Sequence, residues 1–336
     1  MIIGEHDTSR GVLLVAEIGN NHEGDFARAE ELVRAAAGCG VDAVKFQTFR
    51  TRDFVSPRDR DRFERMARFE LSWGQFERLA GLARSLGLLF LSTPLDILSA
   101  DFLSGVVDGF KIASCDSNFY PLMARVAASG KPVILSGGMA TWDEIVGAKE
   151  FIEDAWVLRD QSPGLAVLHC VSAYPVPDSE ANLAVIPRLA KRLDCTVGYS
   201  DHTLGIDACL AAVALGARII EKHFTLDKNQ SSFRDHQLSA DPGEMRQIVR
   251  CARRIERLLG VAEKAVQPSE MANQRLLRRG IVAARELCAG HRLSIEDLTW
   301  MRPAEGLAPG NEDLLLGRTL VRGVSPGEPL TAAEVR

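Results

Sequence analysis

The sequence predicts an α/β protein, in which a closed (β/α)8 barrel (a TIM barrel) is followed by a small, mostly β domain. Before residue 260, eight short runs rich in Val, Ile and Leu alternate with amphipathic helical stretches. Such runs are typical of parallel strands that are buried on both faces. Eight units within that length match a closed barrel. Beyond residue 260 the segments become short and are separated by Gly and Pro turns.

The eight strands are expected in order along the first part of the chain. They are Val12–Ala16, Ala43–Phe46, Leu88–Leu91, Gly109–Ile112, Pro132–Leu135, Ala166–His169, Thr196–Tyr199 and Arg218–Glu221. Helical patterns lie between them, for example Phe26–Ala37, Trp73–Leu86, Pro121–Ser129, Trp142–Phe151 and Gly205–Ala214. The main alternative is a doubly wound open sheet, whose first strand usually runs into a Gly-rich phosphate turn. Here the first strand runs into the polar segment Glu17–His22 instead.

The chain is expected to have three parts: a barrel over 1–260, a linker over 261–277 and a small domain over 278–336. The small domain carries the expected strands Ile281–Ala283, Leu298–Met301 and Thr319–Val321. About 60 residues is close to the lower limit for a domain that folds alone. We therefore expect it to dock on a barrel, either its own or that of a neighbour.

The overall composition is that of an ordinary globular protein, with 46% hydrophobic and 25% charged residues. The formal net charge of −5 provides no global basic field for nucleic acid or an acidic membrane. No run approaches the roughly 20 apolar residues of a membrane span, and Met1–Arg10 does not resemble a signal peptide. The seven cysteines form no C-x-x-C pair, which favours reduced thiols in a cytoplasmic protein.

Polar residues follow almost every expected strand, where barrel enzymes carry their chemistry. Taken alone, a serine there is usually a helix cap and a histidine is usually structural. The functional interpretation therefore depends on the whole set. In strand order the set is Glu17, then Lys45 and Gln47, Thr93, Lys111 with Ser114 and Asp116, Ser136, His169 with Tyr174, Ser200 with His202, and Glu221 with His223.

Two subsets point to specific ligands. His202 and His223 end adjacent expected strands, which lie about 4.8 Å apart, so their imidazoles could share a divalent metal ion. Lys45 and Lys111 each follow an apolar run, and burying a lysine is costly without an anion. The hydroxyls of Thr93, Ser114, Ser136 and Ser200 and the Gly137–Gly138 turn could complete a phosphate and carboxylate pocket.

At these residues the sequence resembles the sialic acid synthase family. The resembling strings, in the family's order, are AEIGNNHEG (16–24), VKFQT (44–48), LSTP (91–94), FKIAS (110–114), ILSGGM (134–139), LHC (168–170), YP (174–175), GYSDHT (198–203) and EKHFT (221–225). The C-terminal part is similar to the family's antifreeze-like (SAF) domain, including WMRP at 300–303 and Gly317-Arg318. The resemblance thus covers nearly the whole chain.

The resemblance implies a metal-dependent condensation of phosphoenolpyruvate with an open-chain N-acylated hexosamine, giving a sialic-acid-type (nonulosonic) sugar acid and phosphate. Mn²⁺ is the implied metal, with Mg²⁺ or Co²⁺ as alternatives, held by His202 and His223. The implied catalytic residues are Glu17, Lys45, Lys111 and Asp116. Phosphoenolpyruvate would be bound by Lys45, Thr93, Lys111, Ser114, Ser136, Ser172, Tyr174 and Ser200. The sugar would be bound by Glu17, Gln47, Asp116, Tyr174, Asp235 and Arg302, with Arg302 reaching the barrel of the partner in a domain-swapped homodimer.

The sequence departs from the family pattern mainly around the expected sugar contacts. Ser172 stands where Asn is common, Phe233-Arg234-Asp235-His236 replaces a Gly-Pro-Asp-His pattern, and the loop Arg50–Leu71 is short. These departures leave the identity of the sugar open among sialic, legionaminic, pseudaminic and spore-coat types. Two alternatives remain: a catalytically silent sugar-binding relative, and a related barrel synthase acting on a phosphorylated aldose. The intact histidines and lysines argue against the first, and the small β domain argues against the second.

Overall fold

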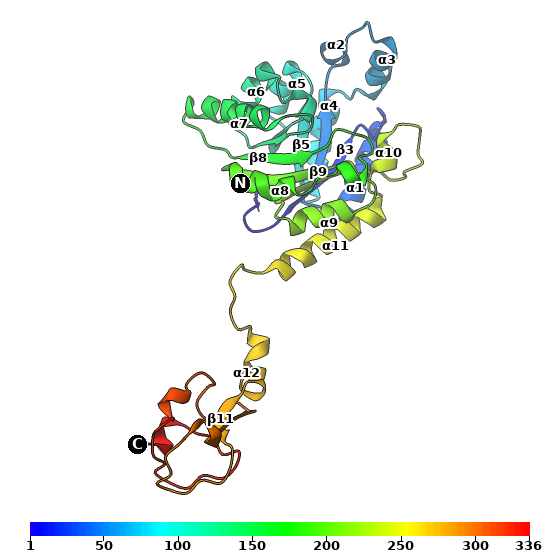
Figure 1. The fold of residues 1–336 in the computed structure, drawn as a ribbon. Coiled ribbons are helices and arrows are strands. Elements are labelled where there is room, and N and C mark those ends of the chain that lie inside the picture. The colour runs from blue at the N-terminus through cyan, green and yellow to red at the C-terminus, as the bar shows by residue number, and fades with distance from the viewer. The chain divides into compact units, whose positions relative to one another are not determined.

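The computed structural model describes residues 1–336 and divides them into two compact units, Met1–Gly260 and Val261–Arg336. In the first unit, eight parallel strands close into a barrel in the order β10-β3-β4-β5-β6-β7-β8-β9, which confirms the predicted fold class (Figure 1). The strands are β3 (Leu13–Gly19), β4 (Ala43–Thr48), β5 (Leu89–Pro94), β6 (Gly109–Ile112), β7 (Val133–Ser136), β8 (Leu165–Cys170), β9 (Thr196–Asp201) and β10 (Ile219–His223).

Helices follow the strands and cover the outside of the barrel (Figure 1). The main ones are α1 (Phe26–Cys39), α4 (Trp73–Ser85), α5 (Ile97–Leu103), α6 (Tyr120–Ala127), α7 (Trp142–Val157), α8 (Val185–Arg192), α9 (Asp207–Ala214) and α11 (Pro242–Leu259). Several begin where the sequence supplies a side-chain cap. Ser72, Thr141 and Asp241 each form a capping box with the residue three positions on, which satisfies backbone N–H groups at the helix start.

The barrel interior has an apolar lower layer and a polar upper layer. Alternate strand residues face inward, so Leu13 and Val15 lead up to Glu17, and Ile219 leads up to Glu221 and His223. The lower layer is a cluster of nine buried residues: Ile3, Leu13, Val15, Ala43, Leu91, Ile134, Ala166, Leu168 and Ile219. Ile3 comes from the N-terminal hairpin of β1 (Ile2–Ile3) and β2 (His6–Asp7). The polar layer therefore lies directly above a layer of buried apolar side chains.

Most strands extend one to three residues beyond their predicted C-terminal ends. β3 continues to Gly19 and β10 to His223, so polar residues predicted at strand ends lie within the strands. The physical reason is that these side chains find partners inside the barrel, which lets the hydrogen-bonded backbone continue. The segment 50–71, treated as a loop in the prediction, contains α2 (Thr51–Phe54) and α3 (Arg60–Phe69).

The second unit is built around the antiparallel pair β11 (Gly280–Ala283) and β12 (Leu298–Met301). Its core includes Ile281, Leu298 and Leu320, all buried. Two expectations differ in detail. The segment 261–277, predicted as a linker, contains the short helix α12 (Met271–Leu277), and Thr319–Val321 forms isolated bridges rather than a strand. No helix in either unit combines the length and hydrophobicity needed to cross a membrane.

Candidate active site

Two adjoining cavities lie at the C-terminal ends of the barrel strands. The inner cavity has a volume of about 350 Å³. Seven of the eight strands or the turns just after them contribute to it: its lining includes Glu17, Gln47, Lys111, Ser114, Ser136, Cys170, Ser172, Ser200, His202, Glu221 and His223. The sequence therefore predicted most of the residues that converge there. Convergence follows from the fold, since parallel strands end on one face of the barrel.

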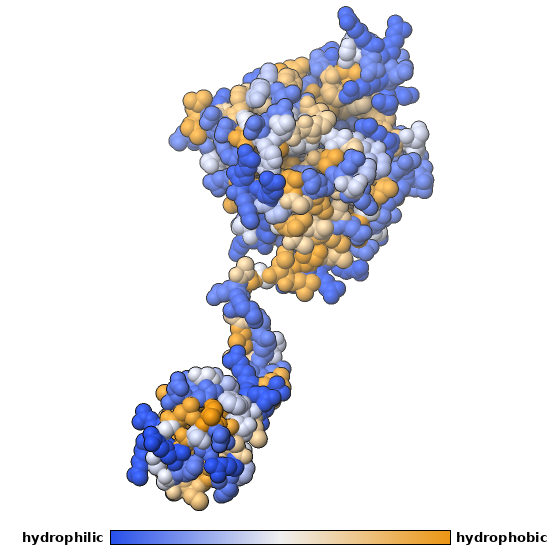
Figure 2. Space-filling view, viewed as in Figure 1, coloured by the Kyte–Doolittle hydropathy of each residue, from blue (hydrophilic) through white to orange (hydrophobic).

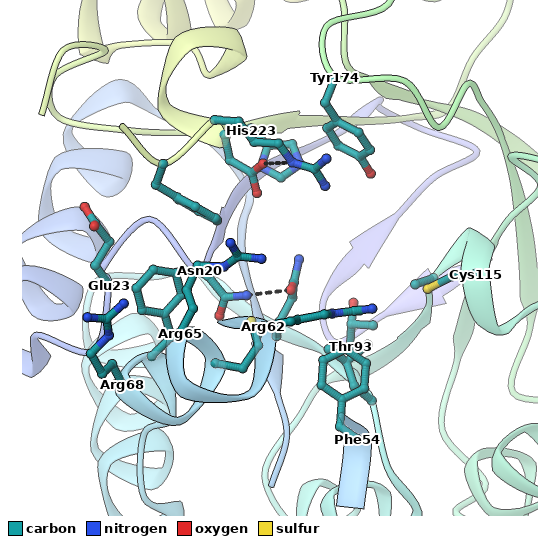
Figure 3. A pocket seen from close by; sticks show the side chains of 18 of the residues that line it. Asn20, Glu23, Phe54, Arg62, Arg65, Arg68, Thr93, Cys115, Tyr174 and His223 are labelled. Atoms are coloured by element: carbon teal, nitrogen blue, oxygen red, sulfur yellow. Dashed lines mark hydrogen bonds and ion pairs between the residues drawn. The ribbon is translucent and has the colours of Figure 1, made fainter. Parts of the chain in front are cut away.

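The outer cavity is larger, about 1000 Å³, and lies over the loops (Figure 3). Its lining combines the turn after β3, helices α2 and α3, and the segment before α10 (Asp235–Leu238). The two cavities adjoin, because the same seven residues line both: Gln47, Arg62, Ala113, Cys115, Tyr174, His223 and Arg234. Volumes of this size are typical of small-molecule sites.

Lys45 is the centre of a buried charge network beneath the inner cavity. Its Nζ lies 2.8 Å from Glu17 Oε2 and 3.7 Å from Glu221 Oε2, and it donates a hydrogen bond to Thr93 Oγ1 at 3.2 Å. Burial alone would lower the pKa of Lys45, but the two carboxylates raise it, so the ammonium stays charged. The counter-ions of Lys45 are therefore supplied by the protein, and this lysine lines neither cavity.

The pKa values of the two carboxylates of this network are shifted in opposite directions. Burial is the main influence on both. It raises the pKa of Glu17, and the nearby Glu221 adds to the effect. For Glu221, Lys45, Lys111 and a 2.8 Å hydrogen bond from Ser200 Oγ outweigh burial and lower the pKa. A pair of carboxylates separated in this way suits one that holds a proton and one that stays ionised.

Lys111 is the buried cation of the inner cavity that has no carboxylate partner. It is only 3% exposed, and its Nζ donates to Ile112 O at 2.9 Å without an ion pair. Burial lowers the pKa of Lys111, and Glu221 opposes that effect. The nearby hydroxyl of Ser136 is buried and has no hydrogen-bond partner. An unpaired ammonium and an unsatisfied hydroxyl in one cavity are suited to an anionic ligand.

The predicted histidine pair also lies at this face. β9 and β10 are paired, and the rings of His202 and His223 have centroids 5.4 Å apart. His202 Nδ1 lies 2.8 Å from Val171 O, so it carries the proton and leaves Nε2 free as a lone-pair donor. His223 Nδ1 is buried without a partner, and burial lowers the pKa of His223 well below its ordinary value. In their neutral forms the two imidazoles present free nitrogens that fit a divalent metal.

A buried ion pair behind the histidines holds their backbone in place. Lys222 Nζ lies 2.7 Å from Asp201 Oδ2 and donates to Thr203 O at 2.6 Å. Asp201 Oδ1 accepts from Tyr199 Oη at 2.9 Å and from the Thr203 N–H at 2.8 Å. Because Asp201 and Lys222 directly precede His202 and His223, this network fixes the strand ends that carry the imidazoles.

The remaining predicted residues have different positions. Thr93 and Asp235 line the outer cavity, and burial raises the pKa of Asp235. Asp116 follows β6 but lines neither cavity, and it accepts a 3.6 Å contact from the Cys115 thiol. Arg302 belongs to the second unit, where its Nε donates to Leu277 O at 2.6 Å. The structure thus assembles the inner set and leaves Asp116 outside it.

The sequence analysis assigned no role to two features of the site. The first is Glu221. Its alternation with Ile219 and His223 along the strand could have predicted that its side chain faces the barrel interior. The second feature is a group of arginines, Arg62, Arg65 and Arg68 on α3, which line the outer cavity. Only their spacing of three residues could have indicated a shared helix face.

The fold and the site together define a (β/α)8 barrel with a buried, charged cavity at its strand ends, and comparison with known proteins identifies its family. The model of the NeuB family matches residues 32–264, and that of the SAF domain matches residues 278–336. The chain belongs to the NeuB family. It is accordingly an enzyme, a sugar-acid synthase of the sialic-acid type.

Individual relatives match over most of their length. N,N'-diacetyllegionaminic acid synthase of Legionella pneumophila is 37% identical over 96% of this chain and 94% of its own. N-acetylneuraminate-9-phosphate synthase of Mus musculus is 35% identical over 85% of this chain and 82% of its own. The crystal structure of the N-acetylneuraminic acid synthetase of Leptospira borgpetersenii, solved with citrate, is 34% identical, with a TM-score of 0.74 over 78% of this chain and 90% of that one.

Proposed function

We propose that this enzyme condenses phosphoenolpyruvate with an open-chain N-acylated hexosamine, giving a nonulosonic acid and phosphate. The observation that carries the proposal is the unpaired Lys111 ammonium facing serine hydroxyls in the inner cavity. Lys111, Ser114, Ser136, Ser172 and Ser200 would hold the phosphate. Gly138 supports this cradle, because a Cβ there would lie 2.7 Å from Ser114 Oγ and 2.5 Å from Ser172 Oγ.

The charge balance of the inner site supports a metal in the same proposal. Lys45 and Lys111 face Glu17 and Glu221, so the four groups carry no net charge when all are ionised. Burying a multiply charged anion requires additional positive charge. A proton on Glu17 supplies part of it, and a divalent cation supplies more. No group of three or more His, Cys, Asp or Glu side chains is arranged as a metal cage, so the remaining ligands would be water and substrate oxygens.

We assign that cation, with Mn²⁺ preferred and Mg²⁺ or Co²⁺ as alternatives, to His202 and His223. When bound it would polarise the aldehyde of the acceptor. The protein's own groups then act in turn. The phosphate cradle holds phosphoenolpyruvate so that C3 faces the aldehyde carbon, and the new C–C bond forms between these atoms. Glu17, whose raised pKa favours the protonated form, gives its proton to the aldehyde oxygen, which becomes a hydroxyl.

The second half of the reaction takes place at C2 of the former phosphoenolpyruvate. Water adds to this carbon, and its released proton returns to Glu17. The tetrahedral intermediate then loses phosphate by cleavage of the C–O bond, and its hydroxyl proton passes to the departing phosphate, leaving the keto acid. Ionised Glu221 keeps Lys45 charged beneath the site, and Thr93 beside Lys45 could receive the carboxylate. Atoms balance as phosphoenolpyruvate, aldose and water giving sugar acid and phosphate.

The acceptor would extend from the inner cavity into the outer one, past Gln47 and Tyr174, toward Asp235. Tyr174 packs against the His202 ring with centroids 4.3 Å apart, so in this proposal an aromatic surface would lie beside the reacting carbon. The positions at which the sequence departs from the family pattern, Ser172 and Phe233-Arg234, lie around this path. We therefore infer that side chains of the loops, rather than those of the strands, determine which acceptor binds. A domain-swapped homodimer in which the partner's Arg302 completes the sugar site is part of the proposal.

The direct test is phosphate release from phosphoenolpyruvate across a panel of N-acyl and diacetamido hexoses, with Mn²⁺ present. We expect release with at least one acceptor and a mass-spectrometric product of acceptor plus pyruvate. The Lys111→Ala protein, assayed at a phosphoenolpyruvate concentration below the wild-type KM, is the matched control for contaminating phosphatase. Release that is equal in the absence of any acceptor, or equal in the Lys111→Ala protein, would contradict the proposal.

A further inference from the structure

Three side chains form a hydrogen-bonded chain that leads from the outer cavity to the inner one. Asn20 Nδ2 donates to Gln47 Oε1 at 2.8 Å, and Gln47 Nε2 donates to Glu17 Oε1 at 3.3 Å. Figure 3 shows Asn20 on the wall of the outer cavity, with its hydrogen bond drawn as a dashed line. Gln47 lines both cavities, and Glu17 lines the inner one. The chain therefore connects the outer wall with a carboxyl group of the inner site.

The backbone of β3 brings Asn20 to this position. The pairing of β3 with β4 shifts by one residue between Glu17 and Gly19, where the backbone takes a φ of +53°. Such an irregularity re-aims the side chains that follow it, and here it puts Asn20 beside Gln47. A Cβ at position 19 would lie 3.0 Å from Glu17 Oε1 and 3.5 Å from Gln47 Nε2, so glycine leaves the room that their hydrogen bond needs.

The order of donors and acceptors along the chain is set by its Glu17 end. An amide side chain donates at its nitrogen and accepts at its oxygen. Glu17 Oε1 accepts, and after the proton transfer proposed above both oxygens of Glu17 can only accept. Gln47 must then turn its NH2 group toward Glu17 and its carbonyl toward Asn20. The NH2 group of Asn20 pairs with that carbonyl and holds the amide of Gln47 in one orientation.

Gln47 consequently presents a donor, and not an acceptor, to a bound ligand. Its Nε2 has two hydrogens, one of which Glu17 uses, whereas its Oε1 is occupied by Asn20. Gln47 is one hydrogen bond away from Glu17, the proposed proton donor to the aldehyde, so the ligand atom that meets Gln47 belongs to a substituent close to the aldehyde. In an N-acylated hexosamine this substituent is the acylamino group on the neighbouring carbon, whose carbonyl oxygen is a strong acceptor.

Apolar side chains protect this arrangement from water. Asn20 is only 5% exposed. Met66 and Phe69 of α3 are buried and line the same cavity, whereas Figure 2 shows a strongly hydrophilic outer surface over α2 and α3. A hydrogen bond shielded from water is electrostatically stronger than an exposed one, so Asn20 controls the orientation of Gln47 more firmly than a solvated side chain would.

We propose that Asn20 is a positioning residue that determines acceptor specificity. By holding the carbonyl of Gln47, Asn20 makes Gln47 present an N–H to the carbonyl oxygen of the N-acyl group of the acceptor. The inference rests on the proposed function and specifies how this site recognises an N-acylated sugar. It predicts that the enzyme distinguishes acceptors by the hydrogen-bonding strength of that one oxygen, and that this ability depends on Asn20.

The experiment compares two acceptors that differ only in this atom, an N-acylmannosamine and its thioamide, because sulfur is the weaker hydrogen-bond acceptor. We expect kcat/KM to be about two- to ten-fold higher for the amide, as expected for one neutral hydrogen bond. Asn20→Asp keeps the shape of the side chain but cannot donate, so Gln47 should turn its NH2 group toward position 20 and its carbonyl toward the ligand. The ratio should then fall to one or below.

Two further variants show whether the effect is specific. Asn20→Leu removes the donor without adding charge, and it should also bring the ratio to about one while the KM for phosphoenolpyruvate stays at the wild-type value. Asn229→Asp is the matched control, because it makes the same chemical change at an exposed residue that lines neither cavity. It should keep the full ratio. A general loss of structure would instead change the constants for both substrates together.

A binding measurement separates this inference from the proposed function. Calorimetry with the alditols of the amide and the thioamide, which have no aldehyde, reports the contact without turnover. Tighter binding of the amide that is lost in both Asn20 variants supports the role of Asn20 even if no acceptor releases phosphate, a result that would refute the proposed function. Equal use of the two acceptors by the wild-type enzyme, or a preference unchanged in both variants, overturns the inference while phosphate release still supports the synthase.

Discussion

The two cavities are built in opposite ways. At the inner site the charged groups come mainly from strands and are almost fully buried. Lys45, beneath the cavity, pairs with Glu17, and Lys111 is the lysine without a carboxylate partner. In the outer cavity the charged groups come from α3 and the segment before α10, are mostly exposed, and include three arginines without carboxylate partners.

This difference indicates that the groups of the inner cavity carry out the reaction and those of the outer cavity determine which acceptor binds. Side chains on strands are held rigidly by the barrel ladder and by each other, which is what a reacting group requires. Side chains on surface helices tolerate substitution at little cost to stability, so they can change with the substrate. We therefore expect inner substitutions to affect the reaction and outer ones to affect the choice of acceptor.

The largest effect is expected from removing an imidazole. His202→Ala or His223→Ala should abolish Mn²⁺ binding and lower kcat/KM more than about 100-fold, because each change removes one of the two proposed metal ligands. The melting temperature should change little, since both rings line a cavity rather than the apolar core. Metal content after dialysis and the steady-state rate are the measurements. His6→Ala, on the N-terminal hairpin, is the control. An His202→Ala protein with unchanged metal content and rate would show that this residue is not a ligand.

A smaller but more selective effect is expected at Lys111. Lys111→Ala removes a charge-assisted hydrogen bond of ~1.5–3 kcal/mol, so the KM for phosphoenolpyruvate should rise about ten- to a hundred-fold. The KM for the sugar should change much less, because the proposed sugar site lies mainly in the outer cavity. Initial rates over both substrate concentrations would separate the two constants. Lys149→Ala, which breaks only the surface pair with Glu153, is the control. Equal changes in both constants would place Lys111 outside the phosphate pocket.

A substitution at Asp235 should change the KM for the acceptor and not the KM for phosphoenolpyruvate, the reverse of the effect at Lys111. Asp235→Asn keeps the size of the side chain but removes its charge, so the KM for the acceptor should rise about five-fold, for a lost interaction of ~1 kcal/mol. The KM for phosphoenolpyruvate should stay the same. The same initial-rate matrix measures both constants. A change confined to phosphoenolpyruvate would contradict the division between the two cavities.

The smallest signal is expected from a test of whether a second chain completes the site. If Arg302 acts on a partner's barrel, mixing Arg302→Ala subunits with Lys111→Ala subunits should restore on the order of a quarter of the wild-type activity, because each mixed dimer has one intact site. Co-purification of differently tagged chains must first demonstrate subunit exchange. Exchange without recovered activity would show that Arg302 acts within its own chain or not at all.

The sequence alone was enough to predict the barrel and most of the inner site. Eight apolar runs at regular spacing specify parallel strands, and parallel strands of a closed barrel end on one face. Once that is known, His202 and His223 must be neighbours, and Lys111, Ser136 and Ser200 must converge. Local chemistry and strand topology carry this information, and neither depends on the details of packing.

Only the tertiary structure decided which of these charges are free. Lys45 and Lys111 have the same local context, yet Lys45 is paired with two carboxylates and Lys111 with none. The difference depends on distances across the barrel between residues far apart in sequence, such as Lys45 and Glu221. The same holds for α3: its arginines look like any solvated helix face until the fold brings them to a cavity rim without carboxylate partners. Pairing is a property of three-dimensional distance, which one-dimensional spacing does not encode.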